Sequence, residues 1–351
     1  MSKWKTVRLG DVLIQQDKSK IKAGEGIDDG VYPFYTCSNE LTKQINTAQY
    51  KGPALIFGTG GKASVHFCSG SFSTSTDCLV YKTSKEVNLS LVNKYLRKNM
   101  YLLENGFKGA GLKHISREYI ANIEIPLPEI LEQNKLVSQF DLIESSITNH
   151  KKMLEKYDTL IKSRFIEMFG DPVTNEKGWD LKTLPELGEF GRGVSKHRPR
   201  NAPELLGGKY PLIQTGDVAN SNLYITEYSS TYSEIGYNQS KMWKAGTLCI
   251  TIAATIAKTA ILTFDSCFPD SVVGFTPNEK TNILFINYWF SFFQRILEEQ
   301  APAVAQKNIN LQILSELNII NPPLLLQNDF AAFVQQIDKS KFEYKTTGVA
   351  A

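Results

Sequence analysis

The sequence predicts an α+β protein with an internal duplication, in which two strand-rich domains alternate with two long helices. Three observations carry this prediction. The segment Ile130–Phe169 contains neither Gly nor Pro over 40 residues. Apolar residues recur in it every seven positions, as in a coiled coil. Short motifs of the first half return in the same order in the second half. Two long helices separated by a globular domain pair most naturally in antiparallel fashion, which gives the chain a pseudo-two-fold symmetry.

The long helix is expected to need a partner helix along one side. Two seven-residue series, one through Leu136 and one through Phe140, lie three or four positions apart. At about 1.5 Å per residue the helix would be about 60 Å long. Pro128 precedes the segment and Gly170 follows it, as is usual at helix ends. The residues expected to pair the two helices are Leu136, Phe140, Ile143, Ile147, Leu154 and Ile161 in the first, and Phe330, Val334, Ile337 and Tyr344 in the second.

The segment before the long helix is expected to form short strands and one helical patch. Strands with Gly-rich or Ser/Thr-rich links are expected at Ala54–Phe57, Ser64–Cys68 and Cys78–Tyr81. A helical patch is expected at Leu89–Leu103, and the run Ile120–Pro128 is expected to be a strand that prolines end.

The second half repeats these features at matching spacings. Trp4 is matched by Trp179 at an offset of 175, and Ile115 by Ile309 at an offset of 194, so the second copy carries about 19 extra residues. Most of them fall between Tyr210 and Lys258. Other matched segments are Tyr32-Pro33 with Tyr210-Pro211, Thr59–Val65 with Thr255–Ile261, Asp77–Val80 with Asp270–Val273, Leu89–Leu103 with Leu284–Leu297, and Ile115–Ile143 with Ile309–Ile337.

The repeat divides the chain into four parts: a first strand-rich domain at 1–128, a long helix at 129–170, a second strand-rich domain at 171–322, and a second helix with a tail at 323–351. The second helix begins after Pro323 and is expected to be the shorter one, because Gly348 follows within about 24 residues. Part of the first helix, around Tyr157–Phe169, is therefore expected to lack an internal partner and to offer a docking surface.

Composition excludes several classes of protein. The net charge of +3 is nearly balanced, so basic surfaces must come from local clusters. The five cysteines form no CxxC pair and the four histidines show no metal-ligand spacing, so no metal site is expected. The first residues of the sequence have no apolar segment of the kind found in secretory leaders, and no run of eighteen apolar residues occurs, so neither a leader nor a membrane span is expected. A cytoplasmic location and no membrane partner are expected.

Two segments superficially resemble catalytic motifs. Asn321-Pro-Pro-Leu324 resembles the Asn-Pro-Pro-aromatic motif of adenine methyltransferases, but Leu324 cannot stack on a flipped base. The repeat instead aligns it with a strand end and helix start. The Gly-rich run Phe57–Gly61 has neither methyl-donor nor P-loop spacing, so it is either a turn between strands or a loop that approaches DNA closely. No catalytic residue is predicted.

The strongest functional signal is basic clustering in loops. The segment Arg192–Arg200 places five basic or titratable groups within nine residues, and its Gly and Pro prevent a helix. Phosphate contact needs that density, and Arg can also bind guanine through two hydrogen bonds. The alternative is a solvated loop. Matched polar positions in the two copies suggest two similar ligand surfaces. The residues expected to contact DNA are Thr59, Lys62, Ser64, Lys113, His114, Arg192, Lys196, His197, Arg198, Arg200, Gln214, Lys258, Gln306, Lys307 and Asn308.

Taken together, the sequence is similar to the specificity subunits of Type I restriction-modification enzymes. The resemblance covers nearly the whole chain and rests on the order of the motifs and on the duplication. The segments that carry it are Ile125–Pro128 with Leu131–Asn134, Phe165–Pro172, Gly193–Arg200, Tyr210–Asp217, and Leu326–Phe330 with Gln336–Phe342. The short second helix departs from the family pattern.

The resemblance implies a non-catalytic protein that binds double-stranded DNA. Each strand-rich half would be a target recognition domain that reads one half of a bipartite site, and the paired helices would set the spacing between the half-sites. The helices would also dock two methyltransferase subunits, which bind S-adenosylmethionine, while this chain binds no cofactor. Two motor-nuclease subunits would join for cleavage.

Two other classes of function remain open at this point. The chain could belong to a methyltransferase-fused or Type II-like specificity protein, which would need a methyl-donor pocket. It could instead be a coiled-coil scaffold that binds only protein, in which case the basic loop Arg192–Arg200 would be incidental.

Overall fold

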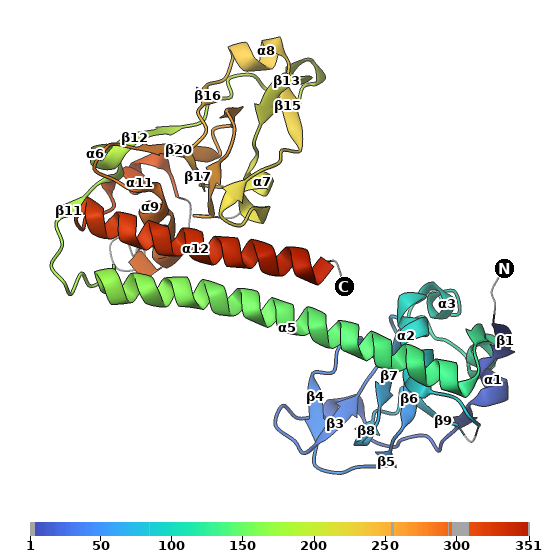
Figure 1. Cartoon of the computed structure of the whole chain (residues 1–351). Helices are drawn as coiled ribbons and strands as arrows, with labels where there is room; N and C mark the ends of the chain where they lie inside the picture. Colours follow the sequence, from blue (N-terminus) through green and yellow to red (C-terminus); the bar gives the residue numbers. More distant parts are fainter. Residues whose placement is uncertain (1–3, 84, 254–255, 294, 297–308, 350–351) are drawn as a thin grey trace. The chain divides into compact units, whose positions relative to one another are not determined.

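The computed structural model describes residues 4–83, 85–253, 256–293, 295–296 and 309–349, with side chains described as far as Lys341 in the last helix. The chain divides into two compact units, Met1–Ile147 and Thr148–Ala351, which we call unit 1 and unit 2 (Figure 1). The helix α5 (Ile130–Phe169) begins in unit 1 and ends in unit 2. Among the described residues, none of the helices is long and apolar enough to cross a membrane.

Unit 1 contains two four-stranded sheets and one two-stranded sheet, with strand orders β2-β9-β6-β7, β4-β3-β8-β5 and β1-β10. Strand β3 runs parallel to β8, and the other described pairs are antiparallel. Its elements are β1 (Lys5–Arg8), α1 (Leu9–Val12), β2 (Ile14–Gln15), η1 (Ala23–Glu25), β3 (Tyr32–Tyr35), β4 (Lys43–Ile45), β5 (Tyr50–Lys51), β6 (Ala54–Gly58), β7 (Ser64–Cys68), β8 (Ser71–Thr74), β9 (Cys78–Lys82), α2 (Leu89–Lys98), α3 (Tyr101–Glu104), α4 (Arg117–Asn122) and β10 (Glu124–Leu127).

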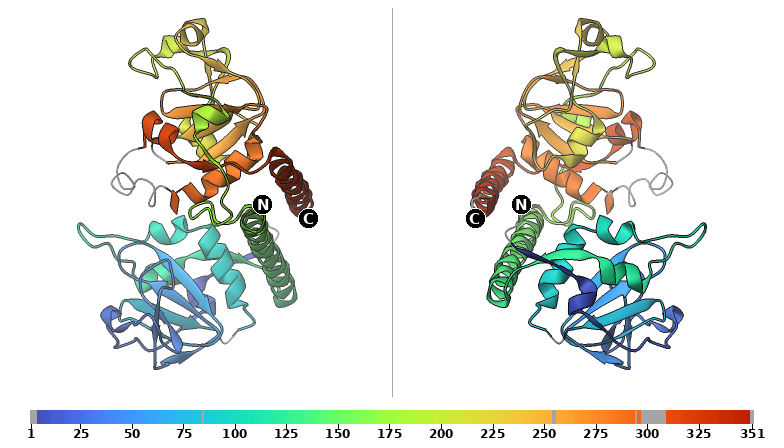
Figure 2. Two further views of the ribbon diagram at one scale, coloured as in Figure 1. Left: turned by 90° about the vertical axis from the view of Figure 1, so that its left-hand side faces the viewer. Right: turned by 90° about the vertical axis from the view of Figure 1, so that its right-hand side faces the viewer.

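Unit 1 has two cores because the β2-β9-β6-β7 sheet is buried on both faces. Strand β6 alternates its side chains between them: Leu55 and Phe57 pack beneath α2, and Ala54 and Ile56 face the second sheet. This alternation follows from the two-residue period of a strand. Strands buried on both faces read as continuous apolar runs, which is why β6 and β9 could be predicted from the sequence. Figure 2 shows α2 lying against this sheet.

Unit 2 repeats this architecture. Its sheets have the orders β12-β20-β17-β18-β14, β15-β13-β19-β16 and β11-β21. Its elements are β11 (Leu181–Lys182), α6 (Leu184–Leu187), β12 (Gly188–Arg192), η2 (Pro203–Leu205), β13 (Leu206–Leu212), α7 (Thr215–Asn220), β14 (Tyr224–Ile225), β15 (Ser230–Tyr232), α8 (Glu234–Asn238), β16 (Met242–Trp243), β17 (Leu248–Thr251), β18 (Thr259–Leu262), β19 (Ser266–Cys267), β20 (Val272–Pro277), α9 (Ile283–Trp289), η3 (Phe290–Phe292), α11 (Leu311–Glu316), β21 (Ile319–Ile320) and α12 (Leu324–Val349).

The predicted duplication is confirmed by sheet topology. Each sheet of unit 1 has a counterpart in unit 2 with the same strand order, and the single parallel pair β3–β8 recurs as β13–β19. The exception is β14, which adds a fifth strand beside β18. Together with α7 it lies in the link between β13 and β15, within the region where the sequence placed the extra residues.

The same side-chain joint fixes each helix to its domain. In unit 1 the side chain of Gln133 accepts a hydrogen bond from the Asn88 N–H at 2.8 Å and donates to the Pro128 carbonyl at 2.8 Å. Asn88 also donates to Asn134 at 2.9 Å and caps α2. In unit 2 the corresponding residues Asn282, Gln327, Asn328 and Pro322 make the same contacts. The repeated Gln-Asn pair is therefore a structural motif that anchors the start of each long helix.

The helices α5 and α12 pack antiparallel within unit 2. The Phe165 ring lies 5.4 Å from the Phe330 ring, and Arg164 lies 5.9 Å from the Phe333 ring centre. Lys341 further along α12 forms an ion pair with the earlier residue Asp158 on α5. The predicted antiparallel return is therefore confirmed. Ile161, Phe330 and Val334 are buried, and Ile337 is partly buried against the same core.

One expectation about the long helix is wrong. The stretch Tyr157–Phe169 was expected to lack a partner, but its apolar side packs into the unit 2 core. Because α12 runs antiparallel to α5 and is the shorter helix, it packs along the C-terminal end of α5. Along the earlier part, Leu136 and Leu154 are half-buried, and Phe140, Ile143 and Ile147 are 42%, 51% and 51% exposed, contrary to the predicted seam. The Tyr344 side chain lies outside the described side chains.

Most of the predicted strands are confirmed, but the bounds of one predicted helix and of one predicted strand are wrong. The three strands predicted in unit 1 form β6, β7 and β9. The expected helix Leu89–Leu103 is interrupted after Lys98 and continues as α3. The expected strand Ile120–Pro128 begins as the end of α4, because Ser116 caps that helix with its side chain, and only β10 is extended.

Candidate nucleic-acid interface

Two loops of unit 1 form the first candidate surface. They are the turn between β6 and β7 (residues 59–63) and the segment 108–114. The Gly61 N–H donates to the Lys113 carbonyl at 3.0 Å, and Nδ1 of His114 lies 3.2 Å from the Thr59 carbonyl oxygen and donates to it. Gly61 has φ +80°, which the turn requires and glycine adopts readily. Lys62, Lys113 and His114 are exposed on this loop pair.

Two residues of this surface that were predicted to contact DNA are held by contacts within the protein. The Thr59 hydroxyl donates to the Asp77 carbonyl at 2.8 Å, so this side chain holds the turn in place. Ser64 is only 1% exposed, because it pairs with Gly58 in a sheet that is buried on both faces. The structure therefore contradicts a DNA contact by Ser64, while Thr59, Lys62, Lys113 and His114 are brought together.

The second candidate surface is the basic loop that follows β12. Gly193 donates to the Val272 carbonyl at 2.9 Å. A Cβ atom at Gly193 would collide with the carbonyl oxygens of Phe268 and Pro269. Glycine is therefore needed for the loop to run directly along the turn that precedes β20.

Three arginines converge on Asp270: Arg192 at the end of β12, and Arg198 and Arg200 in this loop. We call these three residues the arginine cluster. The Asp270 carboxylate forms ion pairs with Arg198, at 3.2 Å, and with Arg200. The Arg192 Nε donates to the Asp270 backbone carbonyl. The cluster could not be predicted as such, because Asp270 lies some seventy positions from the arginines and no sequence spacing links them.

The rest of the basic loop is held by polar contacts. The Gln239 side-chain oxygen accepts hydrogen bonds from the backbone N–H groups of Lys196, at 2.5 Å, and His197, at 3.0 Å. His197 also lies 3.6 Å from Glu204. The side chains of Lys196 and His197 are exposed. The loop is thus an ordered basic surface rather than an unattached segment.

The remaining predicted residues of unit 2 lie elsewhere or are not described. Gln214 is exposed, precedes α7 and donates to the Ser230 hydroxyl at 3.3 Å. Lys258 is exposed at the start of β18. Gln306, Lys307 and Asn308 lie outside the described residues.

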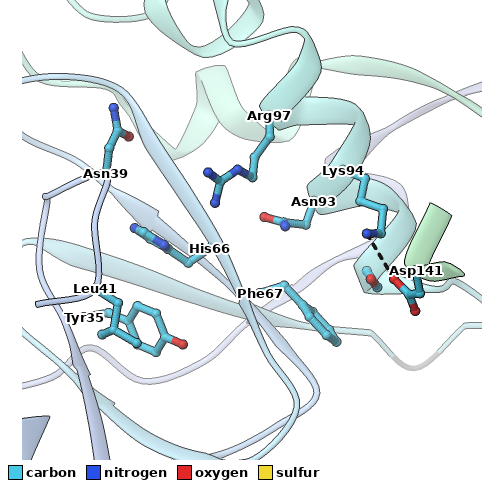
Figure 3. Close-up of a pocket in the computed structure, with 10 residues that line it drawn as sticks. Tyr35, Asn39, Leu41, His66, Phe67, Asn93, Lys94, Arg97 and Asp141 are labelled. Carbon is cyan, nitrogen blue, oxygen red and sulfur yellow. Dashed lines mark ion pairs between the residues drawn. The ribbon is translucent and has the colours of Figure 1, made fainter. Parts of the chain in front are cut away.

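Sequence reasoning missed a polar hollow in unit 1, shown in Figure 3. It measures about 480 Å³ and lies between β7, α2 and the link that follows β3. His66 lines it and shares a hydrogen bond with the Ser38 carbonyl at 2.8 Å, and burial lowers the pKa of this histidine. Arg97 and Asn93 project into the hollow from α2. These residues are scattered along the sequence, so no local pattern could reveal the site.

Sequence reasoning also missed Cys37, which lies beneath the 59–63 turn. Hydrogen bonds from the Cys78 thiol and from the backbone N–H groups of Gly60 and Thr59 lower the pKa of Cys37 to about 6. The Gly60 nitrogen is 3.4 Å from its sulfur. The described residues contain no group of three potential metal ligands.

Comparisons with known proteins agree with this architecture. The family described as "Type I restriction modification DNA specificity domain" matches residues 1–156 and 176–348. The chain is 27% identical, over 95% of its length and 81% of the relative, to the specificity subunit of the Type I restriction enzyme EcoDI from Escherichia coli. It is 23% identical to the MjaVIII specificity subunit from Methanocaldococcus jannaschii, over 59% of this chain and 51% of the relative.

Two solved structures share the fold. The S subunit of a Type I restriction-modification system from M. genitalium superposes with a TM-score of 0.68 at 13% identity, covering 99% of this chain and 92% of that one. A chain from a structural study of complex assembly and conformational transition in a type I R-M system gives a TM-score of 0.50 at 16% identity, covering 99% and 96%.

Proposed function

Because the chain belongs to the Type I restriction modification DNA specificity domain family, we propose that each of its two units reads one half of a bipartite DNA site. The observation that carries this proposal is the duplicated framework, which presents exposed basic loops in both units. In unit 1 these are the 59–63 turn and the 108–114 segment, and in unit 2 the loop that contains the arginine cluster. Lysine and arginine at such positions contact phosphates, and arginine also reads guanine.

The long helix α5 would set the spacing between the half-sites. It is one continuous helix of 40 residues that begins in one unit and ends in the other. We further propose that the helices dock two methyltransferase subunits and that two motor-nuclease subunits complete the assembly, in the cytoplasm. The methyl donor S-adenosylmethionine would bind to the methyltransferase, and this chain would catalyse nothing and bind no cofactor.

The decisive experiment maps methylated adenines in DNA from cells that express this chain with its cognate methyltransferase. We expect a split motif, two short defined sequences separated by a gap of fixed length. A matched strain lacking the chain should show no such motif. A single continuous motif would contradict the two-unit reading.

The two alternative functions make different predictions. If the purified chain alone transferred labelled methyl groups to DNA, it would be an enzyme of the methyltransferase-fused class. If replacing Arg198 and Arg200 with alanine left DNA affinity at low salt unchanged, the protein-only scaffold would be favoured.

A further inference from the structure

We propose that Asp270 is a specificity-determining residue, which positions the arginine cluster and limits its attraction for DNA of arbitrary sequence. This inference rests on the proposed function. It assigns a role to an acidic residue in the middle of a basic surface, where the carboxylate by itself would repel phosphates.

The geometry places Asp270 beneath the arginines. Its side chain is 23% exposed, whereas those of Arg198 and Arg200 are 55% and 44% exposed. The carboxylate is therefore partly sheltered, while the guanidinium groups remain open to solvent. Arg198 is held most firmly, because its Nη1 also donates to the carbonyls of Ser195, at 2.6 Å, and His197, at 2.8 Å.

These contacts leave part of the Arg198 guanidinium free. A guanidinium has five N–H donors in a planar fork. Partners among the described residues take two donors on Nη1 and one on Nη2, so the remaining donors can face a ligand. An arginine fixed in this way can hydrogen-bond only to acceptors at one position and in one orientation. Such an arginine favours binding to a base edge over binding to any nearby phosphate.

The carboxylate is not needed to form the turn in which Asp270 lies. The turn is closed by the hydrogen bond from the Val272 N–H to the Pro269 carbonyl, at 3.0 Å. Arg192 contacts the backbone carbonyl of Asp270, not its side chain. An Asp270→Asn substitution therefore removes one charge and weakens the hold on Arg198 and Arg200, but it leaves the turn and the Arg192 contact in place.

The first test measures binding of the full chain to a 20-base-pair duplex of random sequence at several salt concentrations. Asp270→Asn should raise affinity about threefold to tenfold and steepen the slope of log affinity against log salt by about one, because one more cation becomes available to phosphates. Asp265→Asn is the matched control. It removes the same charge from unit 2, where Asp265 pairs with Lys244 at 2.7 Å, and it should change affinity less than about twofold.

The second test is motif selection from random DNA with the cognate methyltransferase present. Asp270→Asn should make one half of the split motif degenerate and leave the other half unchanged, since unit 1 is untouched. Asp270→Glu keeps the negative charge but places it on a longer side chain. This variant should keep binding to the random duplex weak while still altering the half of the motif that unit 2 reads. Thermal unfolding of each variant establishes that it is folded.

The possible results distinguish a failure of the role proposed for Asp270 from a failure of the proposed DNA-binding function. If Asp270→Asn and Asp265→Asn raise random-duplex affinity equally, or if the selected motif is unchanged, Asp270 has no special role. If an Arg198→Ala, Arg200→Ala double variant binds DNA as the unaltered chain does, the proposed function of the loop fails as well.

Discussion

In unit 1 the strand β7 ends its sheet, whereas in unit 2 the equivalent strand β18 is covered by β14. The difference arises in one link of the chain. After β3 a short link, residues 36–42, leads to β4 and lines the polar hollow beside β7. After β13 a longer link, residues 213–229, forms α7 and β14 instead. The longer link of unit 2 thus covers a sheet edge whose counterpart in unit 1 lies beside the hollow.

The candidate loops of the two units follow different strands, β6 in unit 1 and β12 in unit 2, but a matched backbone carbonyl anchors both. In unit 1 the Asp77 carbonyl accepts hydrogen bonds from the Thr59 backbone, at 2.9 Å, and hydroxyl, at 2.8 Å. In unit 2 the matched Asp270 carbonyl accepts from Arg192. The same backbone group therefore anchors a short turn with a single lysine, Lys62, in one unit and the loop with the arginine cluster in the other. The duplicated framework therefore supplies an equivalent anchor point in each unit, whereas the loop that uses this point differs between the units.

The largest expected effect compares the two parts of α5. Phe165→Ala should lower the free energy of unfolding by about 3–5 kcal/mol, because a buried aromatic side chain is lost from a packed core. The Phe165 ring contacts those of Phe169, Phe285 and Phe330 at 4.9–5.4 Å. Phe140→Ala is the control, since that side chain is 42% exposed, and it should change stability by less than about 0.5 kcal/mol. Chemical denaturation measures both, and equal losses would contradict the difference in packing.

A smaller effect is expected at the two helix joints. Gln133 is 1% exposed and Gln327 is 0% exposed. Replacing either with alanine removes the glutamine partner of a buried carbonyl and of a partly buried backbone N–H, at a total cost of about 1–3 kcal/mol.

The helix-joint substitutions also test whether the units are equivalent. The loss should be similar for Gln133→Ala and Gln327→Ala, as judged by hydrogen exchange at the start of α2 and of α9. Gln139→Ala and Gln335→Ala, at exposed positions of the same two helices, should leave exchange unchanged. A loss in only one unit would show that the two joints are not energetically alike.

The smallest effect concerns reactivity rather than stability. With its pKa lowered to about 6, Cys37 is mainly thiolate at neutral pH, so its alkylation by iodoacetamide should rise through pH 6 and level off above pH 7. Cys78→Ala removes the hydrogen bond that contributes most to this lowering, so the midpoint should move to higher pH. In unit 2, burial raises the pKa values of Cys249 and Cys267, and both should stay unlabelled in the folded chain. Mass spectrometry at pH 5–9 measures the labelling, and a midpoint above pH 8 for Cys37 would contradict the prediction.

The sequence predicts the framework well because periodicity and repetition reflect burial. The 40-residue segment Ile130–Phe169 became α5 without a change of bounds, since Gly and Pro mark its ends. The continuous apolar run Ala54–Phe57 became a strand buried on both faces. The sequence match between Asp77 and Asp270 also corresponds to two equivalent backbone carbonyls, each of which anchors a candidate loop.

The candidate site was less predictable, because it depends on contacts between residues distant in sequence. The basic loop was visible as a cluster of charges, but its arrangement around Asp270 was not. Ser64 resembled its polar neighbours and is nevertheless buried, because both faces of its sheet are covered by distant segments of the chain. The partner of α5 was placed at the wrong end, since the antiparallel direction was predicted but its register was not.

The repeated joint between domain and helix has a consequence for how such chains diversify. Asn88 with Gln133 and Asn282 with Gln327 make the same hydrogen bonds with the same atoms. A recombination event that moves a whole strand-rich domain onto the helix start of the other copy would therefore recreate the joint intact. New combinations of half-site readers can arise by exchange of intact segments, without a period in which the connecting architecture must be rebuilt.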